Sequence, residues 1–222
     1  MLKLAIIPAY NEASKIAAVV EKTRPFVDRV IVVNDGSADE TALQALHAGA
    51  SVVSHRVNRG LGASLCTGFA VARVLNADIA ITLDADLQHD PAEIPGFIQA
   101  IASGADVVIG SRMMKGATGE MPLIRRIAQV CGNIVTYFLF GAWVSDSQSG
   151  YRALSRHALN TVQLRTNRME ISSEIVAETK QKGLKLKEIP IRSIYTDYSM
   201  AKGQSFFVGL KTAVKLLIRR IK

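Results

Sequence analysis

Short apolar runs alternate with helix-length amphipathic stretches through the first half of the chain. The runs are rich in β-branched residues and are bounded by polar residues or glycine, which is typical of strands. We expect strands at 2–8, 30–34, 51–54, 79–83 and 106–110, and helices at 14–22, 39–48, 61–75 and 91–102. Strands that alternate with helices predict right-handed crossovers and a doubly wound, mostly parallel α/β sheet. In such a sheet the ligand binds at the carboxyl ends of the strands.

The second half of the chain has a less regular pattern. It predicts helices at 123–141 and 168–181, strand-like segments at 150–154 and 185–195, and a closing helix at 206–222. These strands are too few to form an independent sheet. We therefore expect one domain over residues 1–222, with the second half as an elaboration of the first.

Composition and charge narrow the class of protein. The 222 residues are 49% hydrophobic and 21% charged, as in ordinary globular proteins. The net charge is +8, but residues 1–110 hold 8 Lys and Arg against 12 Asp and Glu, whereas residues 111–222 hold 19 against 7. An acidic half joined to a basic half suggests a carboxylate site opposite a surface that receives phosphates, a membrane or nucleic acid. Cys66 and Cys131 lie far apart, so neither a disulfide framework nor a zinc site is indicated, and a reducing compartment fits. The first residues lack a basic segment followed by a long apolar one, so we expect no signal peptide.

Polar residues follow three of the predicted strands, and the carboxyl ends of parallel strands share one edge of a sheet. The first strand ends in Pro8, Tyr10, Asn11 and Glu12, the second ends in Asn34 to Ser37, and the fourth ends in Asp84 to Asp90. Ser37 and Glu40 fit a capping box, so we expect Ser37 to cap the second helix. Asp35 is either a binding residue or part of an ordinary Asp-Gly turn.

A pair of carboxylates gives the most specific chemical signal. Asp84 and Asp86 flank one small residue directly after an apolar strand, so both can face the same crevice. A divalent cation bound to a diphosphate would relieve their repulsion, because Mg²⁺ or Mn²⁺ takes hard oxygen ligands and completes its shell with phosphate and water. Gln88 can add a neutral oxygen. The alternative is a solvated acidic turn. The chain has neither a GxxxxGK[ST] loop nor a GxGxxG loop, and Gly60 and Gly62 more simply permit a tight turn into the third helix.

Six motifs follow one another along the chain: PAYNE at 8–12, NDGS at 34–37 with DET at 39–41, NRGLGA at 58–63, DADLQHDP at 84–91, GSR at 110–112 and DSQSGYR at 146–152. They occur in the order found in glycosyltransferase family 2, and the chain resembles that family over nearly its whole length. The resemblance is closest to the branch that contains dolichol-phosphate mannosyltransferase and related polyprenyl-phosphate sugar transferases. It implies the nucleotide-diphospho-sugar (GT-A) fold, with residues 1–110 binding the nucleotide sugar and residues 111–222 binding the acceptor.

The resemblance also implies a role for each matching residue. Pro8, Tyr10, Glu12 and Asp35 would hold the base and ribose, Asp84 and Ala85 the nucleotide, Asp86 and Gln88 the metal, and Arg112, Arg125 or Arg126, and Lys202 the diphosphate or the acceptor phosphate. Asp146 joins Asp86 and Arg112 at the reaction centre: it would be a general base if the acceptor is a hydroxyl, whereas an ionised phosphate needs no base. Where the family has an Arg after an Ile-Pro-Ile strand, this sequence has Thr196, with Arg192 and Tyr195 nearby.

Two amphipathic segments suggest a membrane surface. Residues 127–144 carry no charge, but Gln129, Asn133 and Thr136 continue a polar stripe that begins at Arg125 and Arg126. This pattern predicts a helix that lies in a headgroup layer or against the domain, not one that spans a bilayer. The segment 206–222 has the same basic amphipathic character, and simple packing of both helices on the core is the alternative. We expect a cytoplasmic protein bound peripherally to the anionic cytoplasmic membrane face, with a membrane protein as a further candidate partner.

The leading expectation is an inverting, metal-dependent transfer of a hexose from a GDP-sugar or UDP-sugar to a polyprenyl or dolichyl phosphate. One alternative keeps the donor and changes the acceptor to a saccharide hydroxyl. The other is a catalytically silent module that binds an anionic membrane or nucleic acid. Asp84, Asp86 and Gln88 argue against a silent module, and a basic patch without interleaved aromatic residues argues against sequence-specific RNA binding. We expect no nucleic-acid partner.

Overall fold

The computed structural model describes residues 1–118, 123–192 and 194. Lys202, Tyr195, Thr196 and the helix expected at 206–222 lie outside the described residues. The strands are β1 (Lys3–Ala9), β2 (Arg29–Asn34), β3 (Ser51–Ser54), β4 (Ile79–Thr82), β5 (Val107–Ser111), β6 (Arg152–Ser155) and β7 (Leu186–Pro190). The helices are α1 (Ile16–Thr23), α2 (Thr41–His47), α3 (Leu61–Val74), α4 (Ile94–Ala102), α5 (Leu123–Phe140), α6 (Arg156–Thr161) and α7 (Ile171–Gln181), with short 3₁₀ turns η1 (Arg24–Phe26) and η2 (Pro91–Glu93). Only the six-residue α6 was not predicted among these helices.

The strands form one mixed sheet in the order β3-β2-β1-β4-β6-β5-β7. All the neighbours pair in parallel except β6, which runs antiparallel to both β4 and β5. Arg152 at the start of β6 pairs with Thr82 at the end of β4 and with Ile109 near the end of β5. The loop before β6 therefore lies at the edge of the sheet where the parallel strands end.

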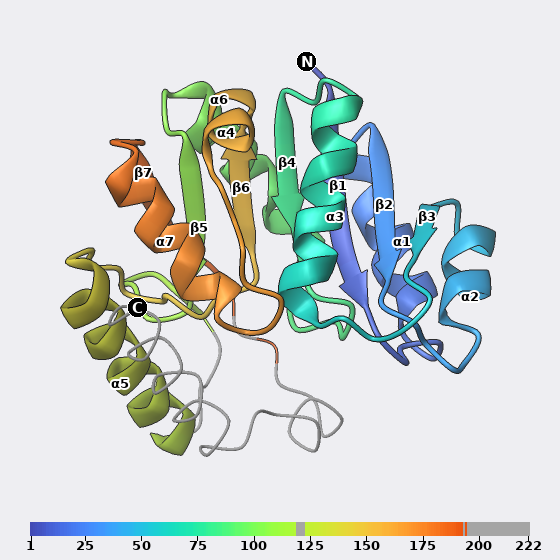
Figure 1. The fold of residues 1–222 in the computed structure, drawn as a ribbon, viewed down its shortest axis with the longest axis horizontal. Coiled ribbons are helices and arrows are strands. Elements are labelled where there is room, and N and C mark those ends of the chain that lie inside the picture. The colour runs from blue at the N-terminus through green and yellow to red at the C-terminus, as the bar shows by residue number, and fades with distance from the viewer. Residues whose placement is uncertain (119–122, 193, 195–222) are drawn as a thin grey trace.

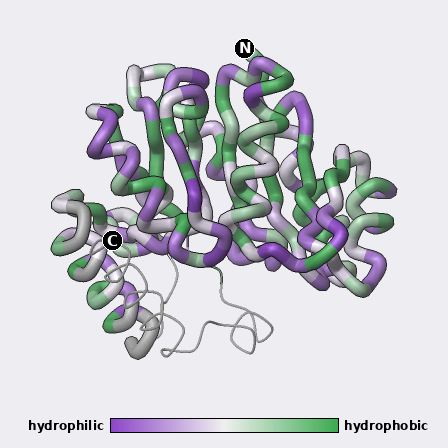
Figure 2. Tube along the Cα trace, in the orientation of Figure 1, coloured by the Kyte–Doolittle hydropathy of each residue, from purple (hydrophilic) through white to green (hydrophobic). Residues whose placement is uncertain are grey.

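The sheet is the middle of three layers (Figure 1). Side chains alternate between its faces, as the two-residue period of a strand requires. Ala5 and Ile7 pack with α1, α2 and α4 in one core cluster, whereas Leu4 and Ile6 pack with α3, α6 and α7 in the other. Hydrophobic positions recur along the strands, and hydrophilic ones along the loops at the lower edge (Figure 2).

The capping role expected for Ser37 is wrong. Helix α2 begins at Thr41, with Glu40 as its N-cap residue and no side-chain hydrogen bond at the cap. The Ser37 hydroxyl instead accepts a hydrogen bond of 3.0 Å from the backbone N–H of Asn11. Ser37 thus links the loops after β1 and β2, a long-range contact that a local capping pattern does not reveal.

The tight start of α3 is confirmed. Gly60 is the N-cap residue and has a φ of 97°, a backbone conformation that residues other than glycine rarely adopt. A Cβ atom on Gly62 would overlap the carbonyl oxygen of Thr166. These two glycines let the loop before α7 lie directly on the first turn of α3.

Candidate active site

The loops after β1 and β2 form one hydrogen-bonded unit. Besides the bond from Asn11 to Ser37, the Ala38 N–H donates to Asn11 Oδ1 at 2.9 Å, and the Glu12 N–H donates to Thr41 Oγ1 at 2.8 Å. Asn11 adopts a left-handed φ of 53°, which turns the chain sharply at the end of β1. Tyr10 is exposed on this loop, and Glu12 is buried beneath it.

Asp35 is buried at the end of β2 and organises the loop that leads into α3. Its Oδ1 lies 2.7 Å from His55 Nδ1 and accepts from the Arg59 N–H at 2.9 Å, while its Oδ2 accepts from the Gly60 N–H at 2.7 Å. The other ring nitrogen of His55 lies 2.9 Å from Thr67 Oγ1. Asp35 is therefore more than a turn residue, and its partner His55 was not among the expected site residues. No motif in the sequence singles out His55.

The segment after β4 brings the two expected carboxylates to the edge of the sheet where the parallel strands end, which we call the rim. Leu87 has a φ of 67°, and the tight turn there directs the backbone N–H of Gln88 to Asp86 Oδ1 at 3.1 Å. The Gln88 side-chain amide donates to Asp86 Oδ2. Partial burial raises the pKa of both Asp84 and Asp86, and repulsion from Asp84 raises the pKa of Asp86 further. This arrangement favours a bound cation, which would remove both penalties.

His89 joins the loop that carries Asp84 and Asp86, which we call the carboxylate loop, to the segment before β6. The Asp84 N–H donates to His89 Nδ1 at 3.1 Å, and His89 Nε2 lies 3.7 Å from Asp84 Oδ2. The ring stacks on Tyr151 at 4.8 Å between centroids, and the Tyr151 hydroxyl donates to the Asp90 carbonyl at 3.0 Å. Burial lowers the pKa of His89 to about 4. A neutral His89 thus fixes the Asp84 backbone, a role that the sequence motif did not reveal.

Asp146 forms a forked ion pair with Arg112. Arg112 Nε donates to Asp146 Oδ2 at 2.7 Å, Arg112 Nη2 donates to Oδ1 at 2.9 Å, and the Arg112 N–H also reaches Oδ2 at 3.1 Å. The side-chain amide of Gln129 donates to Oδ1 as well. The Asp146 side chain is 0% exposed and that of Arg112 is 19% exposed. The carboxylate therefore holds the guanidinium at the rim, and its own oxygens are occupied by protein donors.

Arg152 is a second arginine beneath the rim. Its guanidinium donates to the carbonyl oxygens of Ser147, Ser149 and Ser172 at 2.7, 2.8 and 2.9 Å, which ties the loop before β6 to the start of α7. Burial lowers the pKa of Arg152 to about 10, so that it stays charged at neutral pH.

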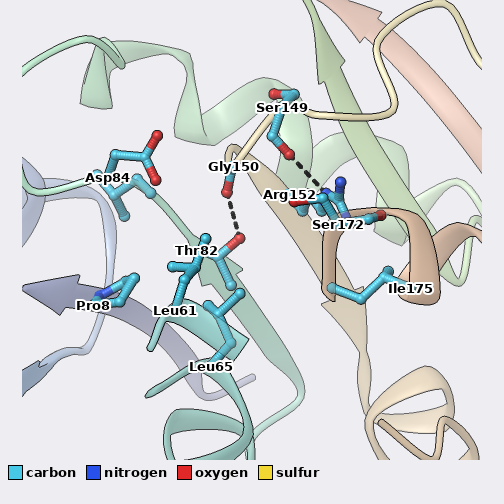
Figure 3. A pocket seen from close by; sticks show the side chains of 11 residues that line it. Pro8, Leu61, Leu65, Thr82, Asp84, Ser149, Gly150, Arg152, Ser172 and Ile175 are labelled. Atoms are coloured by element: carbon cyan, nitrogen blue, oxygen red, sulfur yellow. Dashed lines mark hydrogen bonds between the residues drawn. The ribbon is translucent and has the colours of Figure 1, made fainter. Parts of the chain in front are cut away.

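A small pocket lies beside Arg152 (Figure 3). The residues that line it are Pro8, Leu61, Leu65, Thr82, Leu83, Asp84, Ser149, Gly150, Arg152, Ser172 and Ile175. Thr82 Oγ1 donates to the Gly150 carbonyl at 2.7 Å across the pocket. A Cβ atom on Gly150 would lie 2.5 Å from Asp84 Oδ1, so glycine is needed for the carboxylate to pack against this loop.

The remaining expected cations are more dispersed. Arg126 is exposed on α5, and the side chain of Arg125 is outside the described part of the structure, as is Lys202. Arg192 is exposed, and its backbone N–H donates to Glu93 Oε1 at 2.7 Å beside the carboxylate loop. Among the arginines and lysines expected at the site, Arg112 is the one whose side chain the structure describes at the rim.

The donor set at the rim suits a cation that arrives with a diphosphate. In the part of the chain that the structure describes, no group of three or more His, Cys, Asp and Glu residues could hold a metal ion. Asp84 and Asp86 supply two carboxylates, and the Asp84 side chain is 38% exposed. Mg²⁺ is commonly held by one or two carboxylates together with substrate phosphates and water. The residues therefore fit a divalent cation whose remaining ligands come from the substrate.

Comparisons with known proteins agree with this geometry. Residues 4–162 match the family model described as glycosyl transferase family 2. The chain is 37% identical to UDP-N-acetylglucosamine–dolichyl-phosphate N-acetylglucosaminyltransferase of Methanococcus voltae, over 97% of this chain and 95% of that protein. It is 34% identical to polyprenol monophosphomannose synthase of Mycolicibacterium smegmatis, over 72% of this chain and 64% of that protein. The fold is similar to that of glucosyl-3-phosphoglycerate synthase of Mycobacterium tuberculosis, in its structure with Mn²⁺, UDP and glucosyl-3-phosphoglycerate. The TM-score is 0.71 and the sequence identity is 20%, over 99% of this chain and 79% of that chain.

Proposed function

The chain belongs to glycosyl transferase family 2 and has the GT-A fold, and from this premise we propose that it transfers a hexose from a nucleotide diphosphate sugar to a polyprenyl or dolichyl phosphate. The names of the relatives from Methanococcus voltae and Mycolicibacterium smegmatis support a lipid-phosphate acceptor. In the reaction, an acceptor phosphate oxygen forms a bond to the anomeric carbon while the bond from that carbon to the diphosphate breaks. A single displacement of this kind inverts the anomeric configuration.

The donor side of the proposal depends on the loop after β4. Asp84 and Asp86 would hold Mg²⁺ or Mn²⁺, which when bound supplies Lewis-acid stabilisation of the departing nucleoside diphosphate. Gln88 orients Asp86 through two hydrogen bonds, and His89 fixes the backbone of Asp84. Pro8, Tyr10 and Glu12 would bind the nucleotide from the β1 loop. Asp35 would act there through the Arg59–Gly60 backbone that it holds.

The structural observation that carries the choice of a phosphate acceptor is the pair of Arg112 and the buried Asp146. A hydroxyl acceptor must lose a proton as the new bond forms, and the base needs an oxygen directed at that hydroxyl. Both Asp146 oxygens instead accept hydrogen bonds from Arg112 and Gln129, and the side chain has no exposed surface. A phosphate acceptor is already anionic and needs a cation nearby, which Arg112 supplies. We therefore assign Asp146 to positioning Arg112, and transfer to a saccharide hydroxyl is the second candidate.

The acceptor proposal places the protein at a membrane surface, because polyprenyl phosphates reside in membranes. No helix among the described residues is both long enough and apolar enough to span a bilayer. Helix α5 nevertheless exposes several large apolar side chains beside the site. We propose peripheral attachment at the cytoplasmic face, with Arg126 and the basic second half near anionic headgroups.

A donor panel tests the proposal directly. The protein would be incubated with UDP-N-acetylglucosamine, UDP-glucose or GDP-mannose and a polyprenyl phosphate, with Mg²⁺ or Mn²⁺. Release of UDP or GDP and the mass of the glycosylated lipid would be measured. We expect one donor to give a polyprenyl-phosphate sugar, and Asp86→Asn to abolish that product. Transfer to free saccharides without any lipid product would favour the second candidate, and full activity in EDTA would exclude the metal.

A further inference from the structure

Helix α5 has an unusual orientation, with its polar stripe turned inward. Its buried described side chains are those of Gln129, Asn133 and Thr136. None of the described α5 side chains belongs to either hydrophobic core cluster. Hydrogen bonds from these three side chains hold the polar side of α5 against the protein. Figure 1 shows α5 next to α7.

These hydrogen bonds lead to the loop that carries Asp146. Asn133 Nδ2 donates to the Ser145 carbonyl at 2.6 Å, and the Ser147 N–H donates to Asn133 Oδ1 at 2.9 Å. Gln129 donates to Asp146 itself, one turn earlier on the helix. A shift of α5 would therefore move both backbone neighbours of Asp146 and one of the donors to its carboxylate.

The outward face of α5 is apolar and aromatic. Ile127, Val130, Ile134, Tyr137 and Phe138 are exposed there, and Phe138 is 74% exposed. Trp143, just after the helix, is 62% exposed, and its ring lies edge-on to that of Tyr137 at 5.8 Å between centroids. We call this surface the α5 outer face. A contiguous apolar face on one helix marks an interaction surface, because water does not favour it.

The composition of the α5 outer face selects a lipid bilayer as its partner. Trp and Tyr are the side chains enriched at the boundary between lipid tails and headgroups. The sequence from 121 to 145 contains no Asp or Glu, whereas it contains Arg125 and Arg126. An apolar face that follows two arginines in the sequence, of which Arg126 is exposed, and that has no acidic residue in this segment complements an anionic membrane.

We propose that docking of the α5 outer face on an anionic bilayer positions the Arg112–Asp146 pair, so that the membrane activates the site as well as supplying its acceptor. This inference rests on the proposed function for its catalytic consequence. Gln129 and Asn133 are the positioning residues that transmit the contact, because they lie on the opposite side of α5 from the lipid and bind the loop at 145–147. Membrane binding immobilises α5 and thereby the loop.

Docking can be measured without turnover, because Trp143 is the single tryptophan of the chain. Vesicles of phosphatidylcholine with phosphatidylglycerol should shift Trp143 fluorescence to shorter wavelength as the ring leaves water. Ile134→Ser combined with Phe138→Ser should abolish the shift. The control is Val74→Ser, which removes from α3 an apolar side chain that is at least as exposed and should leave the shift unchanged. An absence of any shift with vesicles would overturn the proposal and leave the outer face to a protein partner.

Coupling to the site needs a second measurement. Hydrogen exchange of the amides at 145–149 should slow when vesicles are added to the wild-type protein. Asn133→Ala should keep the Trp143 shift and lose this protection. If Asn133→Ala does not fold, Thr136→Val is the milder variant, because its loss at this loop is the hydrogen bond of 3.4 Å that Thr136 Oγ1 donates to Ser147 Oγ. A Trp143 shift with unchanged exchange at 145–149 would overturn the coupling, even for a protein in which no transfer activity is found.

Turnover supplies the catalytic readout. With a short, water-soluble prenyl phosphate as acceptor, vesicles should raise kcat by about tenfold, since misplacement of a catalytic group by about 1 Å can cost as much as ~100-fold. Asn133→Ala should bind vesicles and show no rise in kcat. If vesicles leave kcat unchanged while the soluble acceptor is glycosylated, the activation is wrong although the proposed function stands.

Discussion

Replacement of Asp146 by Asn separates a positioning role from a general base. The change keeps the shape of the side chain and removes the charge that pairs with Arg112. One of the two oxygens becomes an NH₂ group, which would face a donor of Arg112 or Gln129. Two hydrogen-bond donors would then point at each other at a position where the side chain of residue 146 has no contact with water.

The size of the effect follows from burial. Removal of one partner from a buried ion pair lowers the free energy of unfolding by about 3–5 kcal/mol. Because Arg112 is 19% exposed, water can solvate part of its charge, so we expect about 2–4 kcal/mol for Asp146→Asn. The control is Asp78→Asn, which weakens a surface pair with Arg156 in which the side chains are 33% and 53% exposed. That change should lower the free energy of unfolding by less than about 1 kcal/mol.

Urea unfolding and the pH profile of kcat/KM provide the assay. Under the positioning role, Asp146→Asn should reduce turnover by about tenfold through misplacement of Arg112, and the acidic side of the pH profile should not change. Loss of a general base would instead reduce turnover by roughly 100-fold to 10,000-fold and remove the acidic limb. That second result, or a stability change no larger than that of Asp78→Asn, would refute the reasoning.

Three further predictions follow from the site and its supports. Asp86→Ala should reduce turnover at least ~100-fold, which nucleotide release measures. It should not lower the melting temperature in thermal unfolding, because burial and repulsion raise the pKa of this carboxyl and make its charge unfavourable in the metal-free protein. Gly62→Ala should destabilise the protein by forcing Thr166 away, whereas Gly96→Ala, at a helical position with the nearest atom 3.7 Å away, should stabilise it by up to about 1 kcal/mol in urea unfolding. The pKa of His89 is lowered from 6.5 to about 4 in the folded protein, so between these pH values the unfolded chain binds a proton that the folded chain does not. The free energy of unfolding should therefore fall as the pH drops from about 6.5 to about 4. Histidine NMR titration of wild type and His89→Gln checks the assignment.

The sequence predicts most of the framework because its signals there are local. Apolar runs such as 30–34 and 51–54 give strands whose bounds differ from the structure by at most one residue. The carboxylates at 84 and 86 follow directly after a strand, and the end of a strand fixes their place at the rim. Helix α6 escapes this reasoning because six residues are too short to show a helical period.

The contacts within the site depend on the tertiary fold and escape the sequence. His55 meets Asp35 across 20 positions, and Arg112 meets Asp146 across 34. The inward direction of the polar stripe on α5 likewise depends on the loop at 145–147, because the spacing of Gln129 and Asn133 shows that a stripe exists and not where it points. For Ser37 the local sequence pattern predicts a helix cap, but the side chain instead accepts a hydrogen bond from Asn11, which lies 26 positions earlier in the chain.

The position of β6 has a consequence for the order in which the chain can fold during synthesis. When the ribosome has released only residues 1–110, β4 has β1 on one side and no strand on the other, while β5 lacks both of its neighbours, β6 and β7. The antiparallel strand that fills the gap is made about 40 residues later than β5, which at roughly 5–20 residues per second leaves the facing edges of β4 and β5 unpaired for seconds. A chain cut after β5, near residue 116, would keep those edges open, so its two fragments should aggregate alone and recover solubility when they are produced together.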